Sequence, residues 1–243
     1  MRKVYLDFTG IYEGEAGPED VYLDLQDIRG TDMYCTPDAQ TQIRERIAHF
    51  GAEGIHFLDS GNYHYMSALF GQEITEDFTL VLFDHHTDMQ KPLMEDLLSC
   101  GGWAAVLADT CKCLKQILVV GPPAESMQEI EVNCRDKLLL VSEEEVLAGT
   151  WQERLARLRR DLPVYVSIDR DVLDPAYAKT NWDQGKLESD HLEEILSELL
   201  CGRRLIGADF CGELSDSSIS IFERQQARAL NRKTDERLLK VLT

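Results

Sequence analysis

Two short stretches of the sequence place aspartates and histidines directly after apolar runs. In "VLFDHHTDMQ", Asp84, His86 and Asp88 are spaced two residues apart, and in "VYVSIDRDVLDP" Asp169 and Asp171 repeat that spacing. If extended geometry continues past the end of each run, the side chains of a set point to one side. Carboxylates held close together repel one another, and a bound cation is the least costly way to hold them. The two stretches are therefore interpreted as halves of one metal site.

The donor types indicate which cation the site would hold. Carboxylate oxygens mixed with imidazole suit Mn²⁺, whereas a structural zinc site would contain more cysteine or histidine. The alternative is that these aspartates only form turns or cap helices, as aspartates at strand ends often do. The metal interpretation is favoured because both stretches show the pattern after an expected strand. His85 falls on the opposite side of its run, where packing or contact with a ligand residue is expected rather than metal binding.

Seven short apolar runs are expected to form strands buried on both faces, because their apolar character is continuous rather than alternating. They are 3–8, 54–59, 78–84, 116–120, 137–141, 163–169 and 204–210. Helical patterns cover 38–50, 65–71, 143–160, 189–200 and 222–241. This alternation predicts a three-layer α/β/α fold with a mostly parallel central sheet. In such sheets ligands lie beyond the carboxyl ends of the strands, which is where both aspartate clusters fall.

Local signals mark the starts of two of these helices. Ser142 with Glu145 three residues later predicts a capping box. Ser189 or Asp190 is expected to cap the helix over 189–200. The section 10–37 shows no regular pattern, and we expect a loop over the site or an excursion at the sheet edge.

The 243 residues are enough for one domain with a substantial core, so a single domain over 1–243 is expected. The net charge of −19 argues against nucleic-acid binding and weakly favours cationic substrates. No apolar run reaches membrane-span length, and Asp7 interrupts the first run, so neither a membrane span nor a signal peptide is expected. The seven cysteines are expected to be reduced thiols in the cytoplasm. They are Cys35, Cys100, Cys111, Cys113, Cys134, Cys201 and Cys211.

The two stretches resemble motifs of the ureohydrolases, a family that includes arginase, agmatinase and formiminoglutamase. "FDHHTD" is similar to the family's D-x-H-x-D motif. "SIDRDVLDP" is similar to S-x-D-x-D-x-x-D-P. The second motif matches at Ser167, Asp169, Asp171, Asp174 and Pro175.

Two further family motifs are matched in part. The G-G-D-H-S motif is similar to "SGNYHYMS", in which His64 stands at the histidine position. The D-I-x-E element is echoed by "GADFCGEL", in which Glu213 lies one residue further from Asp209 than the family pattern has it. Asp209 is interpreted either as a structural acid or as one that contacts a metal ligand, and Cys211 shows no evident chemistry. The resemblance covers roughly residues 54–213.

The resemblance implies a hydrolase with two Mn²⁺ ions per chain. The implied ligands are His64, Asp84, His86, Asp88, Asp169 and Asp171. Asp84 and Asp169 would bridge the ions, and a hydroxide between them would attack the carbon of a guanidino or amidino group. Asp88 would orient that hydroxide and take its proton, and Glu213 is a second candidate catalytic residue. An amine and urea or an amide would be released.

The sequence departs from arginase at the mouth of the site. The loop that carries a proton-donating histidine in arginases reads "LLSCGGWAAVL", with Cys100 or Trp103 in that neighbourhood. The substrate loop is replaced by "AYAKTNWDQGKL". Asn181, Trp182 and Asp183 are candidate substrate-binding residues, with Trp182 placed to stack on a planar cation. Equally, "NWDQG" is consistent with a plain turn. The resemblance implies a small cationic guanidino or amine substrate, and a shortened mouth would admit a larger one, such as an arginine-containing peptide.

Three other interpretations stay open. Histone-deacetylase-like amidohydrolases share the sheet architecture and act on an acylated amine, but they typically keep one zinc, whereas His64 and Asp88 supply ligands for a second ion. The literal "DHH" resembles the DHH phosphoesterases, which have aspartate motifs before it rather than well after it. A metal-binding homologue without turnover is the third. The family also predicts a homo-oligomer, for which the sequence shows no interface.

Overall fold

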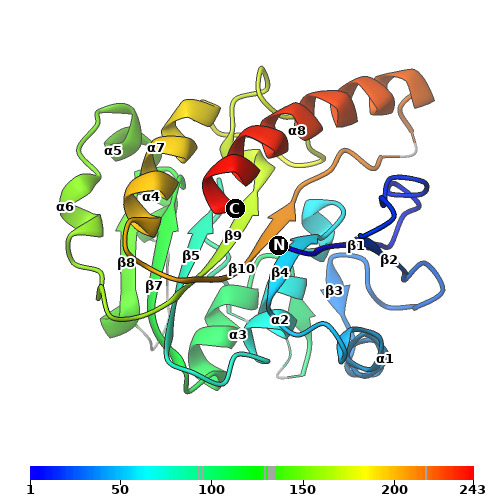
Figure 1. Cartoon of the computed structure of the whole chain (residues 1–243), viewed down its shortest axis with the longest axis horizontal. Coiled ribbons are helices and arrows are strands. Elements are labelled where there is room, and N and C mark those ends of the chain that lie inside the picture. The colour runs from blue at the N-terminus through cyan, green and yellow to red at the C-terminus, as the bar shows by residue number, and fades with distance from the viewer. Residues whose placement is uncertain (92–93, 95, 129, 131–134, 217) are drawn as a thin grey trace.

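A computed structural model describes residues 1–91, 94, 96–128, 130, 135–216 and 218–243. The described residues form a central sheet of eight strands in the order β2-β1-β4-β10-β9-β5-β7-β8, and each neighbouring pair is parallel (Figure 1). The strands are β1 (Lys3–Asp7), β2 (Val21–Asp24), β4 (Gly54–Phe57), β5 (Phe78–Phe83), β7 (Leu114–Val120), β8 (Leu138–Val141), β9 (Val164–Asp169) and β10 (Leu205–Cys211). The short strands β3 (Tyr34–Cys35) and β6 (Leu98–Ser99) form a separate antiparallel pair.

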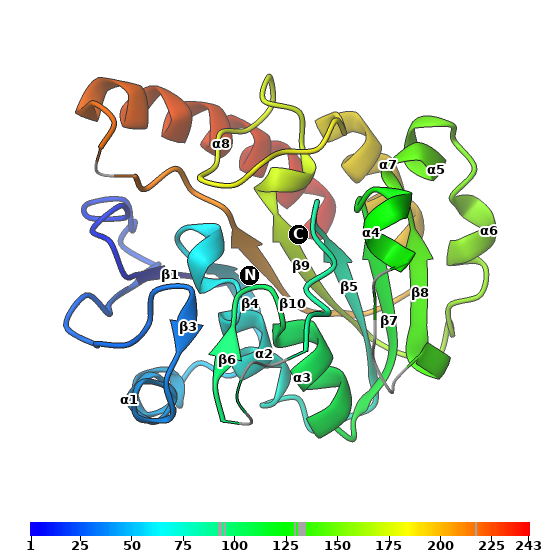
Figure 2. The same ribbon diagram turned by 180° about the vertical axis from the view of Figure 1, so that it is seen from behind.

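Helices cover both faces of the sheet, so the predicted three-layer α/β/α fold is confirmed (Figures 1 and 2). One face carries α1 (Pro37–Ile47), α2 (Met66–Gly71) and α3 (Trp103–Thr110). The other carries α5 (Glu143–Leu147), α6 (Gln152–Leu155), α7 (Ser189–Leu200) and α8 (Ile221–Leu242). The short α4 (Ala124–Gln128) follows β7. Each face has its own hydrophobic core against the sheet.

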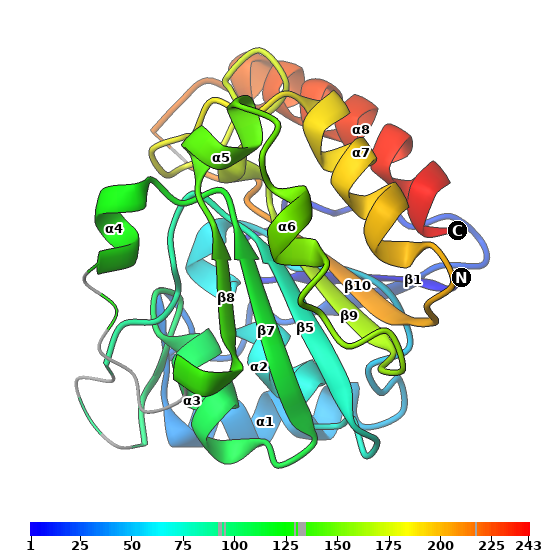
Figure 3. The same cartoon turned by 90° about the vertical axis from the view of Figure 1, so that its left-hand side faces the viewer.

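The seven predicted strands are confirmed, with ends that differ by one or two residues. The strands in the middle of the sheet are buried along their whole length, as β5 and β9 show. That burial explains their continuous apolar sequences, since side chains on both faces pack against helices. The strand β8 lies at the edge of the sheet and is only half-buried (Figure 3).

The section 10–37 is both an edge excursion and part of the site. Its strand β2 pairs with β1 at the edge of the sheet. All four β2 residues retain solvent exposure, so the section lacks the continuous apolar run that marks the central strands. The same section then carries Met33 and Tyr34 to the wall of the cavity described below.

The helix expected over 143–160 was wrong in its extent. It is divided into α5 and α6, because Gly149 has a left-handed φ of 66° and interrupts the first helix after Ala148. The capping box is confirmed: the backbone N–H of Glu145 donates to Ser142 Oγ at 3.2 Å, and that of Ser142 donates to Glu145 Oε2 at 3.0 Å.

One further helix start differs from the expectation, and one helix was not expected at all. The N-cap of α7 is Glu188 rather than Ser189 or Asp190, and its backbone N–H donates to His191 Nδ1 at 3.0 Å. The helix α3 was not predicted. Its sequence "WAAVLADT" is short and apolar on most sides, so it shows no helical period, and most of its residues are buried.

The structure also tests the expectations about membrane-spanning helices and about the state of the cysteines. Within the described ranges, no helix combines the length and the apolar character that a bilayer crossing requires. Six of the seven cysteines are free thiols. The seventh, Cys134, lies outside the described residues.

Candidate metal centre

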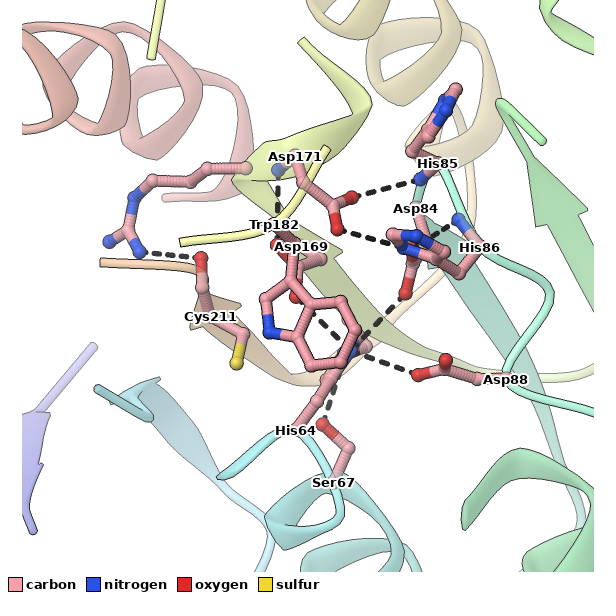
Figure 4. A network of polar contacts seen from close by, with 12 residues as sticks. His64, Ser67, Asp84, His85, His86, Asp88, Asp169, Asp171, Trp182 and Cys211 are labelled. Carbon is pink, nitrogen blue, oxygen red and sulfur yellow. Dashed lines mark hydrogen bonds and ion pairs between the residues drawn. The ribbon is translucent and has the colours of Figure 1, made fainter. Parts of the chain in front are cut away.

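Three adjacent strands end at the same level of the sheet, and two of them, β9 and β5, bring aspartates to one place. In the order β10-β9-β5, Phe83 is paired with Ile168, and Cys211 is paired with Asp169. Asp84 directly follows β5, and Asp169 is the last residue of β9 (Figure 4). The carboxyl ends of parallel strands therefore form the floor of the site, as the position of the two stretches predicts.

One half of the cluster joins His86 to two aspartates. Its Nδ1 lies 2.9 Å from Asp171 Oδ2 and 3.4 Å from Asp84 Oδ1. Asp171 belongs to the 3₁₀ turn Arg170–Val172 that follows β9. Its Oδ1 accepts a hydrogen bond from the backbone N–H of His85 at 3.0 Å, whereas the His85 ring points away from the cluster (Figure 4).

The other half surrounds His64, which follows the 3₁₀ turn Gly61–Tyr63. Its Nδ1 lies 3.0 Å from Asp88 Oδ2, 3.2 Å from Asp84 Oδ2 and 3.4 Å from Asp169 Oδ2. Its Nε2 lies 2.9 Å from Ser167 Oγ, which leaves Nδ1 facing the carboxylates. Asp84 thus contacts the histidines of both halves.

The backbone that carries Asp88 to the cluster is not the extended chain that its spacing predicts. The strand ends at Phe83, and Asp88 has a left-handed φ of 49°. The start of α3 holds it: Trp103 Nε1 donates to Asp88 Oδ2, and the backbone N–H of Ala104 donates to the Asp88 carbonyl at 3.1 Å. Sequence reasoning placed Trp103 in the neighbourhood but missed this contact, because α3 itself gave no signal.

Four buried carboxylates outnumber the two histidines in the cluster, and this imbalance shifts the pKa values of its groups. Burial raises the pKa of Asp169 to about 7 and that of Asp171 to about 6, and neighbouring carboxylates add to both effects. Burial alone would lower an imidazole pKa. Hydrogen bonds to the buried aspartates nevertheless raise the pKa of His64 well above its ordinary value, and that of His86 to about 12. The cluster therefore retains protons near neutral pH, which bound cations would displace.

The residues fit divalent cations. Among the described residues, three sets of side chains could each hold an ion, because the donor atoms within a set all lie within 4.8 Å of one another. They are His64 with Asp84 and Asp88, Asp84 with His86 and Asp171, and His64 with Asp169 and Cys211. All six predicted ligands thus lie in overlapping groups, and carboxylate oxygens with imidazole nitrogens suit a hard cation such as Mn²⁺.

Comparison with known proteins identifies the family to which this arrangement belongs. A sequence model of the arginase family matches residues 16–215. The chain belongs to the arginase family. An uncharacterized protein of Thermotoga maritima is 28% identical over 229 residues, which cover 93% of this chain and 85% of that protein.

Two solved structures share the fold at low identity. The formimidoylglutamase of Bacillus subtilis has a TM-score of 0.68 and 16% identity, covering 99% of this chain and 86% of its own. A triple mutant of the arginase-like protein of T. brucei, described as bound with Mn²⁺, has a TM-score of 0.56 and 18% identity, covering 100% of this chain and 90% of its own. The predicted resemblance to the ureohydrolases is confirmed at the level of the family.

In this arginase-family chain a cavity of about 110 Å³ opens over the cluster. Trp182 forms part of its wall, with its ring 5.8 Å from the His86 ring and its Nε1 donating to Asn62 Oδ1 at 2.9 Å. Gly61 allows this close approach, because a Cβ there would lie 2.8 Å from Trp182 Cδ1. Cys100 also lines the cavity, in the neighbourhood where arginases place a histidine.

The other two candidate substrate residues lie further out. Asp183 Oδ1 is 3.5 Å from His86 Nε2, and its side chain is largely exposed, so it stands at the rim. Asn181 ties two loops together: its Nδ2 donates to Ser215 Oγ at 3.1 Å, and its Oδ1 accepts from the Ser215 N–H at 3.0 Å. Within the "NWDQG" segment, Trp182 therefore lines the cavity, whereas Asn181 makes structural contacts.

Glu213 is not brought into the cavity. Its Oε2 accepts a hydrogen bond from Asn231 at 2.8 Å, and its Oε1 lies 3.4 Å from Arg170 Nη2. Arg170 is fully buried and also forms two 2.9 Å hydrogen bonds to Asp235 of α8. Arg170 stands between Asp169 and Asp171 in sequence, so the contact of Glu213 with the cluster is indirect. Its position supports a role in holding the β9 end rather than in the reaction.

Asp209 belongs to none of the donor groups among the described residues, and its contacts agree with the structural one of its two expected roles. Its Oδ1 accepts a hydrogen bond from Tyr165 OH at 2.7 Å and lies 2.8 Å from His56 Nδ1. All three side chains are fully buried within the sheet core.

Proposed function

We propose that the protein is a hydrolase that cleaves a C–N bond of a guanidino or amidino group, with two Mn²⁺ ions per chain. Residues 1–243 would form a single metallohydrolase domain. The observation that carries the proposal is the set of overlapping donor groups at one end of the sheet. Membership of the arginase family, and the likeness to a formimidoylglutamase and to an Mn²⁺-bound arginase-like protein, support it.

The distances favour one division of the ligands. His64 and Asp88 would complete the shell of one ion, and His86 and Asp171 that of the other. Asp84, whose two oxygens face different histidines, would bridge the ions, and Asp169 would be the second bridge. When bound, two cations lower the pKa of coordinated water and so supply a nucleophile at neutral pH.

Asp88 is the candidate catalytic carboxylate. Trp103 and His64 both contact its Oδ2, which fixes the orientation of the carboxylate group. A carboxylate held in this way would orient the attacking water and accept its proton. Because Glu213 lies outside the cavity, we give it no direct part in the reaction.

The cavity favours a small, planar, cationic group as the substrate. Its base carries four buried carboxylates, and its wall includes the Trp182 ring together with Met33 and Tyr34, two residues from the section 10–37. A guanidinium or amidinium head would be attracted by the acids and would stack on the indole. An arginine side chain of a peptide would present the same head with the peptide backbone left outside.

The test combines a metal count with product analysis. The purified protein is loaded with Mn²⁺, the bound ions are counted, and urea and ammonia release is assayed on arginine, agmatine, guanidino acids and arginyl peptides. We expect two ions per chain and release from one substrate class. Asp169→Asn should lose metal and turnover. Asp174→Asn, in the same motif but outside the donor groups, should keep both.

Other results of the metal count and the product assay would favour the alternative functions. Two ions with cleavage of an acylated amine, and no urea or ammonia from guanidino or amidino compounds, would favour the deacetylase-like alternative. Two ions without turnover on any substrate would favour a metal-binding homologue. No bound metal in the folded protein would contradict the proposal. A cytoplasmic location and a homo-oligomer stay predictions.

A further inference from the structure

Cys211 lies beside the proposed metal ligands. It is the last residue of β10 and is paired with Asp169, the last residue of β9. Its Sγ lies within 4.8 Å of a carboxylate oxygen of Asp169 and a ring nitrogen of His64. All three side chains are buried. The sheet register thus brings a thiol to the His64 side of the centre (Figure 4).

The chain around Cys211 holds the thiol in this place. Its carbonyl accepts a hydrogen bond from Arg170 Nη1 at 2.6 Å, and its thiol donates to the Ser60 carbonyl at 3.2 Å. The next residue, Gly212, has a left-handed φ of 87°, and a Cβ there would lie 2.3 Å from Asp169 Oδ1. A glycine is therefore required for the strand end to approach the carboxylate so closely.

We propose that Cys211 is a sulfur ligand of the ion on the His64 side, so that this position prefers a thiophilic cation such as Zn²⁺ or Co²⁺ over Mn²⁺. The inference rests on the proposed metal centre and extends it. When the metal–sulfur bond forms, the S–H bond breaks and the proton leaves to the solvent, with no change of oxidation state. Thiolate sulfur selects softer cations than carboxylate oxygen does.

The two positions of the centre would then differ. The group around His86 contains only oxygen and nitrogen donors among the residues that the structure describes. Of the two groups that share His64, the one with Asp169 includes the sulfur of Cys211, and the one with Asp84 and Asp88 does not. Cys100 lines the cavity but belongs to none of the three donor groups. Both positions would hold Mn²⁺ when Mn²⁺ alone is supplied, and only the position on the His64 side would exchange it preferentially for Zn²⁺ or Co²⁺.

Cobalt provides a direct probe, because a cobalt–thiolate bond has a sulfur-to-metal charge-transfer band in the near ultraviolet. The metal-free protein is loaded with Co²⁺, and the bound cobalt and the band are measured together. Cys211→Ser removes the sulfur. Cys111→Ser is the matched control, since Cys111 is also buried and its thiol also faces a backbone carbonyl, that of Gly71 at 3.9 Å.

We expect the band in the wild type and in Cys111→Ser, and its loss in Cys211→Ser with two cobalt ions still bound. The preference for Zn²⁺ over Mn²⁺ should fall by about tenfold or more in Cys211→Ser alone. Cobalt bound to the wild type without the band would overturn the inference and leave the metal centre standing. Absence of bound cobalt would overturn both. If Cys211→Ser does not fold, the cadmium NMR shift of the wild type decides between sulfur and oxygen ligation.

Discussion

Trp103 Nε1 donates a hydrogen bond to Oδ2 of Asp88. The donor is fully buried at the start of α3, and the acceptor has a left-handed backbone, so the indole fixes a carboxylate that its own chain leaves in an uncommon conformation. This contact makes Trp103 a positioning residue for the proposed proton acceptor.

We expect Trp103→Phe to lower kcat by about tenfold or more, because a hydrogen bond to a charged group contributes about 1.5–3 kcal/mol. Bound Mn²⁺ should stay unchanged, since the Asp88 carboxylate itself is kept. The measurements are kcat on the identified substrate and the metal count.

Trp151→Phe is the control for loss of an indole. Trp151 is equally buried but belongs to the core on the other face of the sheet. It should lower stability to a similar degree and leave kcat unchanged. Equal losses of kcat in the two variants would show that Trp103 only packs.

Arg170 connects the β9 end to α8, and its loss should destabilise the protein. Arg170→Ala leaves Asp235 and Glu213 buried without their cation, and we expect the free energy of unfolding to fall by about 3–5 kcal/mol. Denaturant titration measures the change. Arg159→Ala, which removes only an exposed pair with Asp161, should leave stability unchanged. Similar stability of both variants would contradict a structural role for the buried network.

Asp59 should make stability depend on pH. Burial raises its pKa to about 7, although it accepts hydrogen bonds from the backbone N–H groups of Phe8, Thr9 and Ser60. Because the folded state holds the proton more tightly than the unfolded chain, the stabilisation is fully present below about pH 4. It is lost as the pH rises through about 7, by at most about 4 kcal/mol.

The comparison is between the wild type and Asp59→Asn, measured by denaturant unfolding from pH 4 to pH 8. The stability advantage of the wild type should shrink as the pH rises, since the variant has no carboxyl group to titrate at this position. A difference that is constant with pH would show that the Asp59 pKa is ordinary in the folded state.

Gly61 should control the position of Trp182. In Gly61→Ala the new Cβ would meet the indole, which must move out of the cavity wall. We expect KM for the cationic substrate to rise by about tenfold, which corresponds to loss of a cation–π contact of 1–2 kcal/mol. In a Trp182→Ala background the same substitution should have no further effect on KM, and an additive increase would contradict the mechanism.

Much of the fold follows from local patterns in the sequence. The central strands β5 and β9 were predicted because both of their faces are buried, which leaves an uninterrupted apolar run. The edge strand β2 and the buried helix α3 were missed for opposite reasons. One is too exposed to show an apolar run, and the other is too apolar to show a helical period.

The sequence by itself pointed to five of the six proposed metal ligands, because Asp84, Asp169 and their neighbours stand at the ends of strands that meet at one edge of a parallel sheet. The resemblance to the ureohydrolase motifs added the sixth, His64. The tertiary structure decided the rest. Only the pairing of β10 with β9 puts Cys211 beside Asp169, and only the fold of α3 turns Trp103 toward Asp88. These contacts join residues that no periodicity relates, since strand order and helix docking are set by the burial of whole faces rather than by local spacing.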